Sequence, residues 1–261
     1  METKKPSLLS NIGHGKNILD VNVPKELETR VLTGVPYFDE IFGDGLDHGL
    51  TPSTTALVTG TSGAGKTTML MQVADACNNP ANNAIAFYNG QEESVYQMRK
   101  VTKRLKMKNG FYVGEDRLIP NVLKHADSLR AANPGKFLIL IIDSIQCHDD
   151  GFYVDGAINS QTSKRVVQQI IDYCKETFTI GLLVGQVGKN GVFLGSNTLK
   201  HALDAHLHLY VDQKPSSASY GQRILKMEKN RFGLANVASL LGMDGTQGLF
   251  GLGSYDPSVE G

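Results

Sequence analysis

A glycine-rich segment spanning residues 60–68 carries the residue types that hold a nucleoside triphosphate. It satisfies the pattern G-x-x-x-x-G-K-S/T and consists of Gly60, Thr61, Ser62, Gly63, Ala64, Gly65, Lys66, Thr67 and Thr68. Glycines let backbone N–H groups approach phosphate oxygens without a Cβ in the way. We expect Lys66 to bridge the β- and γ-phosphates and the Thr67 hydroxyl to hold Mg²⁺. An ordinary glycine-rich turn is the alternative, but the position between a strand pattern and a helix pattern favours a phosphate-binding loop.

Three acidic residues follow predicted strands and could complete a hydrolytic site. Asp143 ends the apolar run 137–142, so it fits the carboxylate that holds Mg²⁺, here through water, beside such a loop. A turn-forming Asp beside Ser144 is the alternative. Glu92 and Glu93 closely follow the predicted strand 84–88, where a carboxylate could orient or deprotonate the attacking water. They could equally be charges favoured by the dipole of the next helix, and both roles can hold at once.

The elements around these residues alternate between strand and helix patterns, which is typical of an α/β fold. Two later segments have period two and indicate antiparallel strands. We therefore predict an open, mostly parallel central sheet with helices on both faces and an antiparallel C-terminal edge. Residues 1–29 lack a sustained period and are interpreted as an arm or linker that could dock on a neighbouring subunit, and residues 30–261 as one core. The expected strands are 54–58, 84–88, 111–113, 137–142, 179–185, 206–211 and 223–228, and the expected helices are 35–42, 66–77, 94–105, 122–130 and 162–176.

Composition limits the classes of function. The chain has 261 residues, 41% of them hydrophobic, with 26 basic and 26 acidic side chains and a formal net charge of zero. No global field would draw it to DNA or to an anionic membrane, so nucleic-acid binding would need a local patch. The three cysteines, Cys77, Cys147 and Cys174, are widely spaced, which argues against a disulfide framework or a four-cysteine zinc site. With no signal-like or membrane-length apolar segment, we expect a cytoplasmic protein.

Three segments resemble the RadA/Sms branch of the RecA-like ATPases, over roughly residues 30–250. The stretch 88–94, YNGQEES, is similar to the family's Tyr-x-x-Gly-Glu-Glu-Ser, with Gln91 where glycine is usual. The stretch 143–146, DSIQ, looks like its Mg²⁺-binding signature, and 229–233 reproduces its motif KNRFG. Members usually begin with a four-cysteine zinc finger and end with a Lon-like domain. We expect the motor core without either, and hence no zinc.

The resemblance implies roles for four residues. Glu92 would be the catalytic carboxylate, and Gln186 a γ-phosphate sensor, although histidine is commoner there in the family. Lys229 and Arg231 would reach across a subunit interface to the nucleotide of the next protomer, so that activity would depend on a hexameric ring or a filament. The plainer alternatives are a surface polar residue at a strand end for Gln186, and charges on a solvated edge strand for Lys229 and Arg231.

The resemblance also implies that single-stranded DNA is bound by loops after two sheet strands. The second loop, 188–200, offers Lys189, Asn190, Phe193 and Lys200 for phosphate contacts and base stacking. The first, 148–162, contains three aspartates and is a poorer candidate. Our leading hypothesis is an ATP-dependent recombination or repair motor. The alternative is a nucleotide-switched regulatory ATPase that acts on a protein partner without DNA.

Overall fold

A nine-stranded sheet runs through the part of the chain that the computed structural model describes, residues 17–152, 160–186 and 197–256. Its order is β3-β2-β4-β5-β1-β6-β7-β8-β9. The six strands from β3 to β6 run parallel, and β6 to β9 pair antiparallel. The strands are β1 (Thr55–Gly60), β2 (Ala84–Gly90), β3 (Tyr112–Gly114), β4 (Phe137–Asp143), β5 (Ile180–Val184), β6 (Ala205–Val211), β7 (Arg223–Asn230), β8 (Val237–Asp244) and β9 (Gly248–Tyr255).

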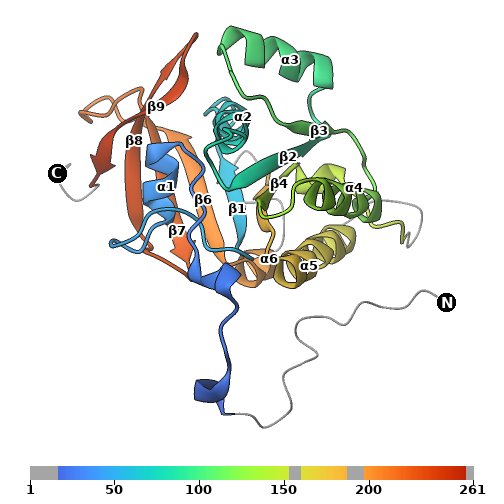
Figure 1. The fold of residues 1–261 in the computed structure, drawn as a ribbon. Helices are drawn as coiled ribbons and strands as arrows, with labels where there is room; N and C mark the ends of the chain where they lie inside the picture. Colours follow the sequence, from blue (N-terminus) through green and yellow to red (C-terminus); the bar gives the residue numbers. More distant parts are fainter. Residues whose placement is uncertain (1–16, 153–159, 187–196, 257–261) are drawn as a thin grey trace.

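Helices cover both faces of the parallel half of the sheet (Figure 1). Successive side chains of a strand point to opposite faces of the sheet, so each continuously apolar strand contributes side chains to two hydrophobic cores, one on each face. Val58 and Ile141 belong to the core under α1 and α2, whereas Leu57 and Ile142 belong to the core under α4 and α5. The helices are α1 (Pro36–Phe42), α2 (Lys66–Cys77), α3 (Val95–Arg104), α4 (Ile119–Ala132), α5 (Ser160–Thr177) and α6 (Asn197–Ala202).

The predicted fold class is confirmed, with local corrections. Strand 206–211 was expected to be antiparallel, but β6 pairs parallel with β1 and antiparallel only with β7. The segment 223–228 continues to Asn230, and β7 lies between two strands rather than at an edge of the sheet. The hairpin of β8 and β9 and the short helix α6 have no counterpart among the predicted elements. Most remaining boundaries agree to within a few residues, and α2 spans residues 66–77 as expected.

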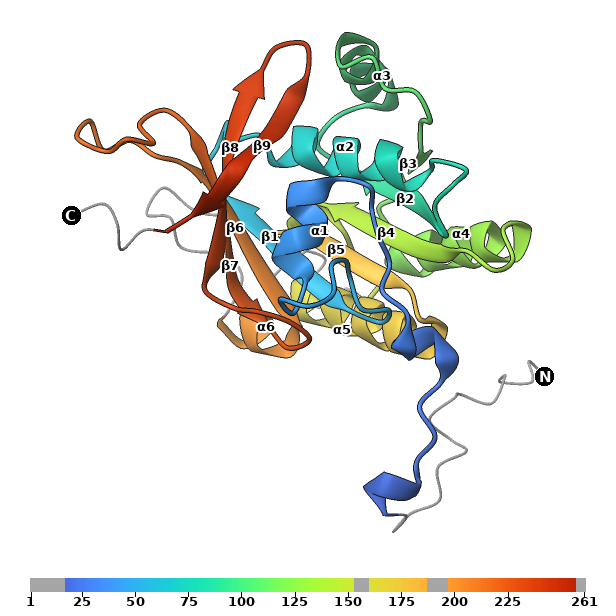
Figure 2. The same ribbon diagram turned by 60° about the vertical axis from the view of Figure 1, so that its left-hand side comes forward.

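Residues 17–29 extend away from the sheet (Figure 2). They contain two short 3-10 helices, Ile18–Asp20 and Lys25–Glu28, in which no residue is buried. Ile18 and Leu19 keep 77% and 88% of their surface exposed. Docking of this arm on a second copy stays a prediction. Among the described residues, no helix has both the length and the apolar character needed to span a membrane.

Candidate nucleotide-binding site

The glycine-rich loop joins the carboxyl end of β1 to the amino end of α2, as the sequence predicts. Gly60 passes so close to β6 that a Cβ would collide with the carbonyl oxygen of Leu209. That carbonyl accepts a hydrogen bond from the Thr61 N–H at 3.1 Å, which ties the loop to the sheet. Gly65, at φ +109°, adopts a left-handed conformation and precedes the first residue of α2. The positive end of the helix dipole therefore faces the space inside the loop.

Lys66 lies within the loop that it helps to form. Its Nζ donates hydrogen bonds to the carbonyl oxygens of Gly60 at 3.0 Å and Thr61 at 3.3 Å. Burial lowers the pKa of the Lys66 ammonium, while Asp143 and Glu92 act in the opposite direction. The ammonium is thus held at the place where a phosphate chain would lie, between backbone carbonyls and carboxylates.

A cavity of about 550 Å³ opens above the loop, which is adequate for a nucleotide-sized ligand. Of the nine predicted loop residues, Thr61 and Ala64 do not line it, and Ala64 is buried. Val184 and Met243 also line the cavity and were not predicted as site residues. Met243 comes from β8, a strand that the sequence analysis did not predict, whereas Val184 ends a strand that it did predict. The lining residues are Gly60, Ser62, Gly63, Gly65, Lys66, Thr67, Thr68, Glu92, Glu93, Asp143, Val184, Gln186 and Met243.

Asp143 ends β4 beside the loop and faces Thr67 across the cavity. The Thr67 hydroxyl donates to the Asp143 carboxylate at 3.4 Å, and the buried Tyr88 hydroxyl donates to the same oxygen at 2.5 Å. Burial raises the pKa of Asp143 to about 6, with Tyr88 lowering it and Glu92 raising it further. A hydroxyl and a carboxylate are oxygen donors that suit Mg²⁺, so the two predicted metal residues fit that cation. The role of Tyr88 as a partner of Asp143 was not predicted.

Glu92 and Gln186 meet at the same edge of the sheet although 94 residues separate them. The Gln186 side-chain N–H donates to the Glu92 carboxylate at 2.6 Å, and the Gln186 backbone N–H donates to the Gln146 side-chain oxygen at 3.3 Å. Glu92 is exposed to the cavity, and Glu93 also lines it. A carboxylate in this position can orient a water molecule, and the amide that donates to it can transfer its hydrogen bond to an anion that enters the cavity.

Lys229 and Arg231 do not lie in this cavity. Ala205 pairs with Ala56 near the start of β1 and with Asn230 at the end of β7. The two cations therefore flank the amino end of β1, while the loop follows its carboxyl end at Gly60, about 13 Å away along the strand at about 3.3 Å per residue. Within one protomer they are remote from the phosphate site.

Only one of the predicted DNA-contacting residues falls within the described structure. Lys200 is partly exposed on α6, while Lys189, Asn190 and Phe193 lie outside the described residues. In the first predicted loop, Phe152 is 68% exposed.

The chain is similar to three bacterial proteins described as "DNA repair protein RadA". It is 30% identical to that of Aquifex aeolicus over 209 residues, 80% of this chain and 43% of the relative. It is 29% identical to that of Haemophilus influenzae over 222 residues (82% and 43%) and to that of Mycobacterium tuberculosis over 231 residues (87% and 44%). The chain thus spans less than half the length of the relatives it matches. No protein-family model matches it.

Two solved structures share the fold. A KaiC-like protein from Pyrococcus horikoshii aligns with TM-score 0.67 and 18% identity over 87% of this chain and 99% of that one. A second structure, an ATPase domain, aligns with TM-score 0.70 and 15% identity over 86% and 92%. The resemblance inferred from the motifs is confirmed: the chain contains a RadA-like core with the fold of the RecA-like P-loop ATPases.

Proposed function

We propose that this chain is a Mg²⁺-dependent ATPase that acts on single-stranded DNA in recombination or repair, as a ring or filament in the cytoplasm. The observation that carries the proposal is the convergence of Lys66, Thr67, Asp143 and Glu92 on one cavity at the carboxyl edge of the sheet. This edge is where open α/β sheets bind their ligands. The similarity to RadA proteins over four fifths of the chain supports an ATPase of the DNA-repair type.

Each residue has a task that follows from its position. Backbone N–H groups of residues 60–65 and the Lys66 ammonium bind the phosphate chain. Thr67 directly, and Asp143 through water, would hold Mg²⁺, which supplies charge neutralisation for phosphoryl transfer. Glu92 orients the attacking water and accepts its proton. Gln186, which donates to Glu92 at 2.6 Å, can transfer that donor to the γ-phosphate and so report its presence to the segment that follows.

The cations at the far end of the sheet point to an assembly. Lys229 and Arg231 flank the amino end of β1. In our proposal the pair serves the nucleotide of an adjoining protomer: Arg231 supplies positive charge that stabilises the transition state, and Lys229 supports it by holding α6 beside it. Specific activity should then rise with protein concentration. A rate per protomer that stays constant through the concentration range of assembly would reject this part of the proposal.

DNA as the partner is supported by the RadA similarity and by the second predicted loop, with Lys189, Asn190, Phe193 and Lys200. The balance of 26 basic and 26 acidic residues favours the alternative, a nucleotide-switched ATPase with a protein partner. The two differ in salt dependence, because replacing phosphate counterions makes DNA affinity fall steeply with salt.

The test combines turnover with DNA binding. Lys66→Ala should abolish ATP hydrolysis, whereas Lys124→Ala on α4 should leave it unchanged. An oligonucleotide titration of the wild-type protein should raise the ATPase rate, and the apparent affinity should drop between low and moderate salt. Normal turnover in Lys66→Ala would refute the ATPase. An ATPase rate that does not change when the oligonucleotide is added, together with no salt-dependent binding of the oligonucleotide, would favour the regulatory alternative.

A further inference from the structure

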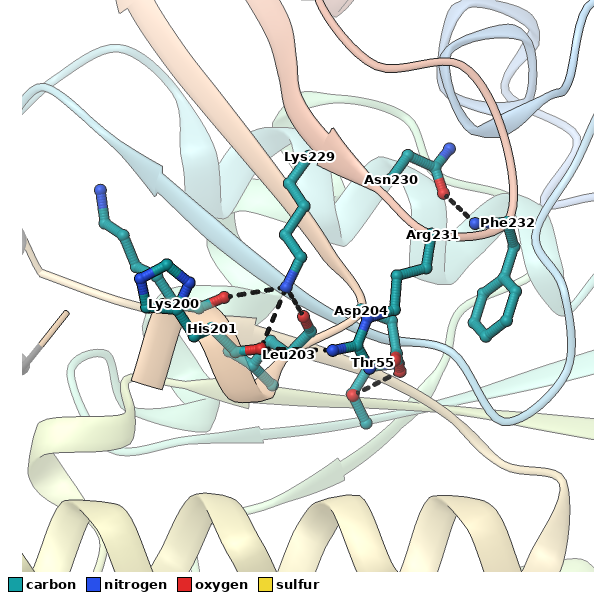
Figure 3. A network of polar contacts seen from close by, with 9 residues as sticks. All are labelled: Thr55, Lys200, His201, Leu203, Asp204, Lys229, Asn230, Arg231 and Phe232. Atoms are coloured by element: carbon teal, nitrogen blue, oxygen red, sulfur yellow. Dashed lines mark hydrogen bonds and ion pairs between the residues drawn. The ribbon is translucent and has the colours of Figure 1, made fainter. Parts of the chain in front are cut away.

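The motif KNRFG ends β7 and continues into a turn, and its cations are engaged by their own chain (Figure 3). Lys229 Nζ donates to the carbonyl oxygens of Lys200 at 3.3 Å, His201 at 3.1 Å and Leu203 at 2.5 Å. These carbonyls lie at and just beyond the carboxyl end of α6, where a cation is favoured by the helix dipole. Lys229 therefore anchors α6 to the end of β7.

Arg231 is engaged differently, by a buried carboxylate. Its Nη1 donates to Asp204 Oδ1 at 3.1 Å, and its backbone N–H donates to the Asp204 carbonyl at 3.0 Å. The Asp204 side chain is 5% exposed, whereas that of Arg231 is 50% exposed. Its Nη2 donates a longer bond to the His201 carbonyl oxygen at 3.5 Å. The guanidinium is thus held by its own protomer while half of the side chain stays exposed, so N–H groups that these two bonds leave free can face an anion outside the protomer.

Asp204 is itself held rigidly by β1. Its Oδ2 accepts the backbone N–H of Thr55 at 3.0 Å and the Thr55 hydroxyl at 2.9 Å, and its own N–H donates to the Thr55 carbonyl at 2.8 Å. Thr55 is fully buried in the first position of β1. A carboxylate oriented by two donors on one oxygen leaves the other oxygen aimed in a defined direction, toward Arg231.

The turn after Arg231 is fixed as well. Asn230 donates to the Phe42 carbonyl at 3.4 Å and accepts the Phe232 N–H at 3.1 Å. Gly233 packs so closely on the carbonyl of Gly43 that a Cβ would collide with it. Both ends of the Arg231 backbone are therefore tied to the core.

We propose that Asp204 is the positioning residue that aims Arg231 at the nucleotide of an adjoining protomer. The inference rests on the proposed function, because it assigns Asp204 to the cation that acts between protomers. Asp204 does not touch the nucleotide. It fixes the angle and reach of the guanidinium through the Thr55–Asp204–Arg231 chain of hydrogen bonds, and Lys229 holds the neighbouring α6 in place.

A double-mutant cycle tests the proposal in the full chain. Asp204→Asn should lower kcat of the assembled protein about 10- to 100-fold, since a displacement of about 1 Å in a catalytic group costs that much. The Kd for a fluorescent ATP analogue at the protein's own loop should change less than twofold. In an Arg231→Ala background the Asp204 substitution should add almost nothing, because a residue that acts through Arg231 has no effect without it. Asp127→Asn is the matched control, because it removes the charge of an exposed aspartate that pairs with Arg130 at 3.2 Å and accepts the Tyr173 hydroxyl at 3.0 Å, both far from Arg231.

The outcomes separate this inference from the proposed function. If Asp204→Asn keeps the wild-type kcat while Arg231→Ala lowers it, Asp204 does not position Arg231. The proposed role of Arg231 between protomers would still stand. Additive effects of the two substitutions would also overturn it, because they indicate a general structural role. A wild-type rate in Arg231→Ala would instead reject the cation role within the proposed function. Should Asp204→Asn fail to fold, Thr55→Val removes one orienting donor and should show a smaller loss of kcat that disappears without Arg231.

Discussion

The identity of the catalytic carboxylate can be decided between two adjacent glutamates. Glu92 and Glu93 both line the cavity, but among the described residues only Glu92 receives the Gln186 amide, at 2.6 Å. We compare Glu92→Gln with Glu93→Gln. Each removes one negative charge from the same cavity, and the glutamine at position 92 keeps an oxygen that can accept from Gln186. The pair therefore separates loss of a proton acceptor from loss of charge.

The magnitude follows from the residues that line the cavity. Among the described residues that line the cavity, the cation Lys66 faces the three carboxylates Glu92, Glu93 and Asp143. These side chains carry a net charge of −2 at neutral pH, and either substitution changes it to −1. Both variants should bind nucleotide at least as tightly as the wild-type protein, because a phosphate chain is repelled less. Loss of a general base costs about 10²- to 10⁴-fold in rate, or about 3 to 5 kcal/mol of transition-state stabilisation. We expect this decrease in kcat for Glu92→Gln and not for Glu93→Gln.

The assay measures kcat by steady-state ATP hydrolysis and Kd by titration with a fluorescent ATP analogue. A Glu92→Gln protein that binds normally and turns over at least about 100-fold slower, beside a Glu93→Gln protein within a few-fold of wild type, is the expected pattern. The reasoning is refuted if the two variants lose kcat equally, or if Glu93→Gln is the slower one.

Two further predictions concern the stability of the sheet behind the loop. Thr59→Val removes the hydroxyl that contacts Nε2 of the buried His206 at 2.7 Å and Nδ1 of the partly buried His208 at 2.9 Å. Leaving these ring nitrogens unpaired should lower the unfolding free energy by about 1 to 3 kcal/mol, which would be seen as a lower urea midpoint at an unchanged m-value. Burial lowers the pKa of His148, so the unfolded state binds more protons between the folded pKa and about 6.5. The contribution of neutral His148 to the unfolding free energy is therefore fully present above about pH 6.5 and decreases as the pH falls toward the folded pKa, by up to about 1.4 kcal/mol per pH unit. His148→Gln should reduce this slope of unfolding free energy against pH. An unchanged slope would contradict the assignment to His148.

The parallel half of the fold was predictable because its signals are local. The short apolar run 137–142, which ends at Asp143, is typical of a strand covered on both faces. Helix α2 begins directly after Gly65 and ends beside Asn78. The site followed from one rule, that carboxyl ends of parallel strands meet at one edge. That rule placed Glu92 and Asp143 near the loop without any long-range information, whereas the role of Gln186 was implied only by the family resemblance.

The antiparallel half was less predictable for a physical reason. Strand β9 (Gly248–Tyr255) carries glycines at 248, 251 and 253, which weaken a strand pattern, and it is held by its pairing with β8. The residues that hold Arg231 were also hidden. Its partner Asp204 is 27 positions away, and Thr55, which orients Asp204, is 176 positions away, so they come together only through strand register. The charge of Arg231 and its place in the KNRFG motif indicated a functional role, but they did not indicate that Asp204 fixes its position.

The placement of the two halves of the site has a consequence for assembly. The phosphate loop follows the carboxyl end of β1, and Arg231 lies past its amino end. In the proposed assembly one protomer would therefore present its nucleotide at one end of the sheet and its cation at the other. Contacts between unlike ends repeat from protomer to protomer, and such a heterologous contact generates a ring if it closes and a filament if it does not. Because Thr55 binds Asp204 at the start of the strand that leads into the loop, the cation proposed to act on a neighbour is fixed to the same strand as the proposed nucleotide-binding loop. The direction of the chain in β1 therefore sets the polarity of the proposed assembly.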